Sequence, residues 1–301
     1  MKRIPATGDL AFKKVFASEE NKDCLGGLIN DFFGVEVSTE AITIETPYSI
    51  EAYREVIQGE EFSVLRHTLK DVAASLQFAG FVSEIQVKST RFFWERALYY
   101  PFNRFCKNYN KQGYMEIGSD GKPNRYSSLI PIYSLNILCQ PHFHDDDALR
   151  IFELYDPVRN KKYKKDLVKI GFFELSKSNV ETTIQQYWRD YFLAGEAHPD
   201  APDYIKKASY IIEYVNLSKE ERDMSDVLEK ARADYDAGFS SAYHDGIELG
   251  EKRGEKRGMK KRDVQIAKDM LKDNEPIEKI TRYLRLDEST IIQLKTEIDS
   301  E

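Results

Sequence analysis

An almost continuous apolar segment, Leu129–Cys139, limits most strongly how this chain can fold. Both alternating positions of the segment are apolar along most of its length, whereas a strand with one face in water would alternate apolar and polar residues. The segment therefore predicts a strand that is buried on both faces of a sheet. Residues 9–33 carry apolar residues at helical spacing, and residues 91–110 are predicted to be helical despite Pro101. Together these features predict an α/β fold.

Local signals predict further elements and some of their boundaries. The stretch at 18–21 is polar enough to break the helix at 9–33, and Gly34 stands where a helix-terminating glycine belongs. Ser218 and Glu221 have the spacing of a capping box, which predicts the start of a later helix. The other predicted strands are Ala41–Glu45, Thr68–Phe78, Phe81–Val87, Arg150–Leu154 and Leu167–Leu175, of which the second and third form a hairpin around Ala79-Gly80.

The composition excludes several classes of protein. The chain has 301 residues, of which 32% are charged with mixed sign and 12% are aromatic, so it is predicted to fold rather than remain disordered. A formal net charge of −7 excludes a strongly basic nucleic-acid coat but not a local nucleic-acid site. No apolar run reaches the roughly 18 residues of a membrane-spanning helix, and residues 1–16 lack the pattern of a secretory signal. The three cysteines, Cys24, Cys106 and Cys139, are far apart in the sequence, which favours a reducing cytoplasm over disulfides or a cysteine zinc site.

The polar residues of the predicted hairpin form the arrangement best suited to chemistry. Side chains alternate along a strand, so Glu84, Gln86 and Lys88 share one face of the second strand. If Asp71 on the first strand shares that face, two carboxylates lie beside an amide and an ammonium group. Close carboxylates repel each other unless a cation lies between them. Oxygen ligands with open water positions suit Mg²⁺ or Mn²⁺. Such an ion can activate a water molecule and stabilise a phosphoryl-transfer transition state. The alternative is a half-buried strand pair whose polar side faces solvent.

Two other polar runs have both a functional and an ordinary interpretation. The run from His142 to Asp147, HFHDDD, combines two histidines with three acidic residues, as some transition-metal sites do. Its position directly after a predicted strand favours a polar loop instead. The basic run Lys161–Lys165 is predicted to be a loop that either contacts a DNA backbone or is simply solvated.

A short internal repeat marks the C-terminal part of the chain. Small residues at four-residue spacing leave a groove along one side of a helix, and because an interior glycine costs about 1 kcal/mol of helix stability, such a helix needs a packing partner. A charged linker is the open alternative. Three short helices predicted after the repeat resemble a helix-turn-helix unit, but the last is acidic, so residues 239–301 are predicted to bind a partner chain rather than DNA phosphates. The repeat consists of Gly246, Gly250, Gly254 and Gly258.

Several blocks, taken in their order along the chain, resemble one known family. On these blocks the chain is similar to the Rpn family of recombination-promoting nucleases, also described as PD-(D/E)XK nuclease family transposases, and the similarity extends over nearly the whole chain. The blocks are GDLAFKKVF with Asp9 and Lys13, Asp71 followed by Glu84-Ile85-Gln86, ERALYY with Arg96, the strand at 129–139, Phe173-Glu174-Leu175 with Lys177, and the glycine-repeat tail.

The resemblance implies a fold and a function. The implied fold is a PD-(D/E)XK, restriction-endonuclease-like αβββαβ core with an α-helical C-terminal extension. The implied function is a metal-dependent DNA endonuclease linked to recombination or transposition, with Mg²⁺ or Mn²⁺ as cofactor and DNA as partner. From the composition and the glycine-repeat tail we further expect no membrane association, a cytoplasmic location and a homo-oligomer formed through residues 239–301. The implied domains are a nuclease-like core at 1–180, a helical extension at 181–238, and a glycine-repeat and helix-turn-helix-like oligomerisation module at 239–301.

The resemblance also implies roles for single residues at the metal site. Asp71 and Glu84 would bind the metal ion, and the backbone carbonyl of Ile85 would be a further ligand. Asp9, on the first helix, is a weaker candidate for the same ion. Lys70 stands where the family name has a proline, a departure that the site is expected to tolerate.

The catalytic lysine of the signature is replaced in this chain. Gln86 occupies its position and would orient or polarise the attacking water, although an amide carries no positive charge. Lys88, two residues later on the same face, could supply that charge. The predicted DNA contacts are Arg91, Arg96 and Lys13, with a solvated helix face as the alternative for the arginines.

Two other functions stay open at this point. The net charge of −7, the glutamine in the lysine position and the acidic tail are compatible with a catalytically weak or inactive nuclease-fold protein that acts as an oligomeric interaction module. A helix-turn-helix DNA binder would require salt-sensitive DNA binding by the tail.

Overall fold

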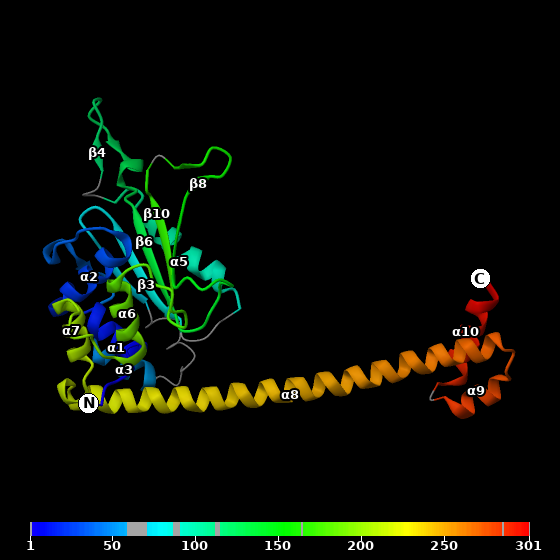
Figure 1. Ribbon diagram of the computed structural model, residues 1–301. Coiled ribbons are helices and arrows are strands. Elements are labelled where there is room, and N and C mark those ends of the chain that lie inside the picture. Colours follow the sequence, from blue (N-terminus) through cyan, green and yellow to red (C-terminus); the bar gives the residue numbers. More distant parts are fainter. Residues whose placement is uncertain are drawn as a thin grey trace. The chain divides into compact units, whose positions relative to one another are not determined.

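The computed structural model describes residues 2–58, 71–86, 91–111, 115–163, 165–284 and 286–300. The chain divides into two compact units, Met1–Asp226 and Val227–Glu301. The first unit contains a six-stranded sheet with helices, and the elements of the second unit are helical (Figure 1). The protein is therefore a mixed α/β protein, as the apolar segment predicted. No helix in the described part of the chain is both long and apolar enough to cross a membrane.

A mixed sheet forms the centre of the first unit. Its strands, in spatial order, are β1 (Thr43–Ile44), β2 (Asp71–Ser75), β3 (Gly80–Gln86), β6 (Ile132–Leu138), β10 (Val168–Glu174) and β7 (Leu149–Glu153). Strands β3, β6 and β10 run parallel to one another, and β1, β2 and β7 pair antiparallel with their neighbours. The apolar segment forms β6, which is buried along its whole length as predicted. Two small hairpins lie outside this sheet, β4 (Glu116–Ile117) with β5 (Pro123–Asn124), and β8 (Tyr155–Asp156) with β9 (Lys161–Lys162).

The helix predicted at 9–33 is divided in two, at the polar stretch where a break was expected. A 3₁₀ turn, Glu19–Asn21, separates the halves. The second half ends at Gly34, whose φ of 64° lies in the left-handed region that glycine adopts without strain. The α-helices that lie within the first unit are α1 (Asp9–Phe16), α2 (Lys22–Phe33), α3 (Ile50–Gln58), α5 (Phe93–Lys107), α6 (Thr183–Ala194) and α7 (Asp203–Ile211).

Helices cover both faces of the sheet. Phe172 and Phe173 are neighbours on β10 and therefore project to opposite faces. On one face, helix α5 packs Phe93 against Phe172, with ring centroids 6.0 Å apart. On the other face, helix α2 packs Phe32 against Phe173, with ring centroids 4.9 Å apart. This two-sided cover explains why β6 and β10 are apolar at both alternating positions.

Helices α6 and α7 pack against α2 through a partly buried polar contact. The indole Nε1 of Trp188 donates a hydrogen bond to Asp31 Oδ2 at 2.7 Å, and the Tyr204 hydroxyl donates to the same oxygen at 2.9 Å. Trp188 is fully buried. The segment from α6 to the start of the next helix therefore belongs to the same compact unit as the sheet. The predicted division into 1–180, 181–238 and 239–301 stays a prediction.

A reciprocal capping box starts helix α8 (Lys219–Lys272). The Ser218 backbone N–H donates to Glu221 Oε2 at 2.8 Å, and the Glu221 backbone N–H donates to Ser218 Oγ at 3.1 Å, which confirms the predicted motif. The other oxygen of Glu221 accepts hydrogen bonds from Lys14 Nζ at 2.5 Å and from the Tyr48 hydroxyl at 2.8 Å. One carboxylate thus joins the first turn of α8 to helix α1.

We expect Glu221→Gln to lower the free energy of unfolding by about 1–3 kcal/mol at neutral pH and by less in acid. Burial opposes the charged form, but hydrogen bonds from Lys14, the Ser218 backbone and Tyr48 outweigh it and lower the pKa of Glu221. A carboxyl group with a lowered pKa adds stability above its unfolded pKa, about 4.3, and that stability is lost as the pH falls through the folded pKa.

Urea unfolding of the wild type and the Glu221→Gln variant at neutral and acidic pH measures this effect. Glu220→Gln is the control, because Glu220 lies on the same helical turn but is exposed to solvent. A difference between the wild type and Glu221→Gln that is the same at both pH values would contradict the role of the charge.

The second unit is built around the C-terminal part of α8. The sequence predicted three separate short helices after the glycine repeat, but α8 continues without a break through the first of these segments, residues 264–271. No glycine or proline lies between Gly258 and Val264, so nothing ends the helix there. Helices α9 (Ile277–Tyr283) and α10 (Glu288–Ser300) complete the unit. A small apolar core joins the three helices and consists of Ala267, Ile280, Leu286, Ile291 and Leu294.

Candidate active site

Strands β2 and β3 bring the two carboxylate positions of the sequence motif together. In their antiparallel ladder Asp71 lies directly opposite Glu84, and Ser75 lies opposite Gly80. Directly opposed positions in such a ladder occupy the same face of the sheet, with Cα atoms about 4.5–5.5 Å apart. The predicted hairpin therefore forms, in a register that pairs the two acidic positions.

Glu84 lies in a buried and charged environment. It is 6% exposed, and Gln86, two residues later at the end of β3, is 7% exposed. Arg96 of α5 forms an ion pair and a hydrogen bond with the Glu84 carboxylate through Nη2. Because a buried carboxylate is costly without compensation, this arginine stabilises the charged form of Glu84. Lys88, the fourth predicted catalytic residue, lies outside the described residues.

The structure adds Asn136 to this row of polar residues. Asn136 of β6 lies in register with Glu84 on the neighbouring parallel strand and is 4% exposed. Its side-chain amide donates a hydrogen bond to the Gly171 carbonyl at 3.1 Å. The sequence pattern alone did not single out this residue. The available signal was the polar pair Ser134 and Asn136, which interrupts the apolar segment at alternate positions and therefore on one face.

Of the other predicted residues, Ile85 lies on β3, and Asp9 and Lys13 lie on α1. Ile85 follows Glu84 in the chain and is buried. Helix α1, which contacts strand β2, carries Asp9 and Lys13. The Asp9 backbone carbonyl accepts a hydrogen bond from the Tyr53 hydroxyl at 3.1 Å. Lys13 is only 5% exposed, so little of its side chain is open to solvent.

The start of α5 presents the two predicted arginines differently. Arg91 is exposed, and its guanidinium lies 4.9 Å above the ring of Phe92. Phe92 precedes α5 with a φ of 63°, a conformation that is strained for a residue with a side chain. Arg96, one turn later, faces Glu84 while its side chain keeps 24% exposure. The structure therefore brings Arg96 to the acidic pair and leaves Arg91 on the surface.

The donor set at this site fits a hard divalent cation. Two carboxylate positions and the carbonyl of an adjoining residue offer oxygen ligands, which Mg²⁺ and Mn²⁺ prefer. Glu84 is buried and already faces a cationic group, Arg96, so its surroundings accept positive charge. The described side chains, among which that of Asp71 is not included, form no cluster of three or more histidine, cysteine or acidic ligands.

A second buried charge network lies on the same face of the sheet. Glu174 of β10 is fully buried and is separated from Gln86 in its row by Leu138. Its Oε2 lies 2.5 Å from Lys177 Nζ and 3.6 Å from Arg150 Nη1. Its Oε1 accepts backbone hydrogen bonds from the loop that follows β6, one of them from the Phe143 N–H at 3.1 Å. These hydrogen bonds therefore fix the loop to the C-terminal end of β10.

The run from His142 to Asp147 belongs to that loop. The ring of His142 packs against Phe93 of α5 with centroids 4.5 Å apart. Asp145 pairs with Arg150 and lies 3.7 Å from Lys177 Nζ. These contacts agree with the polar-loop interpretation of the run, since its acidic groups neutralise basic side chains of the protein itself.

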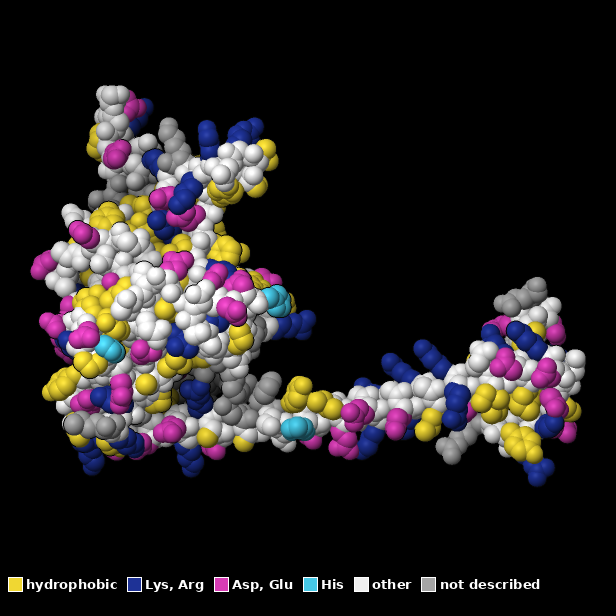
Figure 2. All heavy atoms as spheres, viewed as in Figure 1, with side chains coloured by type: hydrophobic (Ala, Val, Ile, Leu, Met, Phe, Trp, Pro, Cys, Tyr) yellow, Lys and Arg dark blue, Asp and Glu magenta, His cyan; other side chains and the backbone are white. Residues whose placement is uncertain are grey.

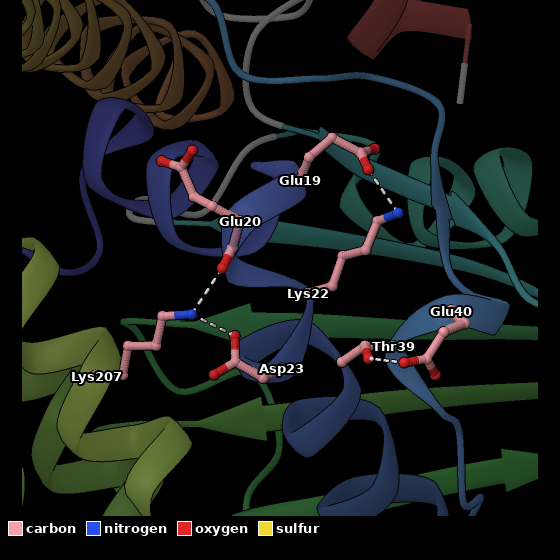
Figure 3. A pocket seen from close by; sticks show the side chains of 7 residues that line it. All are labelled: Glu19, Glu20, Lys22, Asp23, Thr39, Glu40 and Lys207. Atoms are coloured by element: carbon pink, nitrogen blue, oxygen red, sulfur yellow. Dashed lines mark hydrogen bonds and ion pairs between the residues drawn. The ribbon is translucent and has the colours of Figure 1, made fainter.

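An acidic surface pocket lies away from this site. Its lining residues come from the segments around α2 and from α7, and none comes from β2 or β3 (Figure 3). Lys207 bridges the two parts, donating to Asp23 Oδ1 and to the Glu20 carbonyl, each at 2.7 Å. Lys22 pairs with Glu19 at 2.5 Å. We interpret the pocket as an ion-paired contact between helices rather than as a ligand site.

Comparison with known proteins agrees with this geometry. A family model described as PD-(D/E)XK nuclease family transposase matches residues 6–242. The match spans the sheet, the acidic pair and the helices that cover the sheet, and it ends before the glycine repeat. No curated protein and no solved structure gives a significant match to the chain.

Proposed function

Because this chain belongs to the PD-(D/E)XK nuclease family transposases, we propose that it is a divalent-metal-dependent DNA endonuclease that hydrolyses phosphodiester bonds in recombination or transposition. The observation that carries the proposal is the register of β2 and β3, in which Asp71 lies directly opposite Glu84. PD-(D/E)XK nucleases typically use divalent metal ions, and the oxygen donors present here favour Mg²⁺ or Mn²⁺.

In this proposal Asp71 and Glu84 hold the metal ion, with the Ile85 carbonyl as a further ligand and Asp9 as a weaker one. When bound, such an ion neutralises charge on the scissile phosphate and lowers the pKa of a water molecule. Gln86 orients the attacking water through its amide, which can both donate and accept hydrogen bonds. Lys88 supplies the positive charge that an amide lacks.

The order of elements supports an αβββαβ core in the first unit. Helix α2, strands β1, β2 and β3, helix α5 and strand β6 follow one another in this order. Helix α3 is inserted between β1 and β2, and the hairpin of β4 and β5 is inserted between α5 and β6. We propose that these six elements are the nuclease core and that the others are additions to it.

The proposed substrate is DNA. Arg91 and Arg96 lie at the start of α5, where guanidinium groups can contact phosphates on either side of the cleavage point. Lys13 is proposed to contact the scissile phosphate itself, because its burial keeps it from the outer surface. The three cysteines are free thiols, which is compatible with the proposed location in the cytoplasm.

A plasmid-nicking assay tests the proposed function. We expect the purified full chain to convert supercoiled plasmid to nicked circles in Mg²⁺ or Mn²⁺ and to lose this activity in EDTA. Absence of nicking in either metal by folded protein would reject the nuclease and favour the alternative of a nuclease-fold protein that serves as an interaction module.

A second candidate function, self-association through residues 239–301, rests on the open face of α8. A Cβ atom added at any glycine of the repeat would meet nothing within 4 Å. Large apolar residues on the same helix are also exposed, including Tyr243 at 60% and Leu249 at 51%. Both acidic and basic side chains are exposed along α8 (Figure 2). A second copy of the helix would bury the apolar residues and meet charges of both signs.

We expect the double substitution Gly250→Leu with Gly254→Leu to reduce the molecular mass measured by light scattering to that of one chain, because two leucines fill the groove. Lys252→Leu with Lys256→Leu is the matched control, since it adds the same two leucines on the opposite side of the helix. An unchanged oligomer in the glycine variant would reject this interface.

A further inference from the structure

The ion pair between Arg96 and Glu84 points to an exchangeable contact: we propose that Arg96 holds the Glu84 carboxylate until a divalent cation replaces it, and that the freed guanidinium then contacts a DNA phosphate. This inference rests on the proposed function, because it concerns the same metal site. It makes Arg96 a positioning residue that couples metal binding to DNA binding.

One carboxylate cannot fully neutralise both the Arg96 guanidinium and a metal ion. Arg96 Nη2 bonds to Oε1 of Glu84, whose side chain is 6% exposed. A metal ion on the same carboxylate would stand within a few ångströms of the guanidinium, and like charges repel strongly where water is largely excluded. Binding of the cation to Glu84 therefore weakens the hold on Arg96.

Arg96 is less firmly held than Arg104, a comparable arginine on the same helix. Arg104, two turns later, bonds to Glu45 through both terminal nitrogens and also reaches Ser75 Oγ at 3.5 Å. For Arg96, the described residues provide one such carboxylate, Glu84, and the ring of Tyr100 at 5.9 Å. The exposed fractions agree, since the Arg96 side chain is 24% exposed and that of Arg104 is 14% exposed.

Once Glu84 binds a metal ion, a DNA phosphate is a suitable new partner for Arg96. A guanidinium binds carboxylate and phosphate oxygens with the same planar set of donors. A phosphate of a bound DNA strand can therefore replace Glu84 as the partner of Arg96. The two binding events then favour each other, because each relieves the competition for the same carboxylate.

Isothermal titration with Mn²⁺ in the absence of DNA tests the exchange. The full chain is compared with Arg96→Met and Arg96→Gln, and Arg104→Met is the matched control on the same helix. Because the competing charge is removed, we expect both Arg96 variants to bind Mn²⁺ about tenfold more tightly than the wild type. The Arg104→Met variant is expected to bind like the wild type. Arg96→Gln keeps an amide donor for Glu84, so it decides the question if Arg96→Met does not fold.

The outcomes separate this inference from the proposed function. If the wild type binds Mn²⁺ and Glu84→Ala does not, but both Arg96 variants bind equally or more weakly than the wild type, the exchange is wrong and the metal site stands. If neither the wild type nor the Arg96 variants bind Mn²⁺, both proposals are wrong.

DNA binding in Ca²⁺ tests the second half of the inference. We expect Ca²⁺ to strengthen duplex binding by the wild type more than by Arg96→Gln, and the salt dependence of binding to fall by about one phosphate contact in the variant. An equal effect of Ca²⁺ on both proteins would reject the transfer of Arg96 to phosphate.

Discussion

Asp71→Ala and Glu84→Ala are each expected to slow metal-dependent DNA nicking by about 10²–10³-fold, which corresponds to about 3–4 kcal/mol of lost transition-state stabilisation. The physical reason is the loss of one of two opposed carboxylate positions on β2 and β3, which leaves a divalent ion with half of its charged protein ligands. The measurement is the initial rate at which supercoiled plasmid becomes nicked in Mg²⁺ and in Mn²⁺.

The control for these variants is Glu45→Ala. Glu45 is also an acidic residue at the sheet, but it pairs with Arg104 and Ser75 instead of lying in the row of Asp71 and Glu84. We expect this variant to keep the wild-type rate within a few-fold. Nicking that survives both Asp71→Ala and Glu84→Ala would show that the activity comes from another site or from a contaminant.

Glu174→Gln is expected to lower the free energy of unfolding by about 3–5 kcal/mol. The amide can still accept the backbone hydrogen bonds from the loop after β6, so the substitution removes mainly the charge. Lys177, which is 9% exposed, then loses its partner at 2.5 Å and keeps the more distant carboxylate of Asp145, at 3.7 Å, which also pairs with Arg150. A buried cation that loses its nearest carboxylate is strongly destabilising because it has given up its hydration. Urea unfolding followed by circular dichroism measures the difference.

Glu153→Gln is the matched control for this prediction. Glu153 of β7 also pairs with two basic residues, Lys162 and Lys169. Its side chain is 19% exposed, whereas that of Glu174 is fully buried. Solvent screens the Glu153 pairs, so we expect a loss of less than about 1 kcal/mol. Equal losses in the two variants would contradict burial as the cause. The double variant Glu174→Leu with Lys177→Met is expected to lose less than Glu174→Gln, because it also removes the buried ammonium group that Glu174 neutralises, while Arg150 keeps its pair with Asp145.

Local patterns predicted most of the regular structure correctly. The apolar segment at 129–139 forms the central strand β6, and the polar break and terminal glycine of the first helices lie where the sequence placed them. The capping box at Ser218 and Glu221 forms both of its hydrogen bonds. These features are predictable because they depend on residues within a few positions of one another.

Contacts between distant segments were not predictable in the same way. The sequence did not indicate that Asn136 lies beside Glu84, because only the parallel pairing of β3 and β6 brings these positions together. Nor did it indicate that Arg96 of α5 pairs with Glu84 of β3. It also ended the glycine-repeat helix too early, since α8 continues to Lys272.

The sequence by itself determined the α/β class, the family and the two acidic positions of the candidate site, because alternation along a strand and the order of motifs are properties of the chain alone. Only the tertiary structure decided the register that sets Asp71 opposite Glu84, the partner that neutralises Glu84, and the burial of Glu174 with Lys177. Register and burial depend on which segments pack together. That choice is made by the summed free energy of many distant contacts, which no local pattern contains.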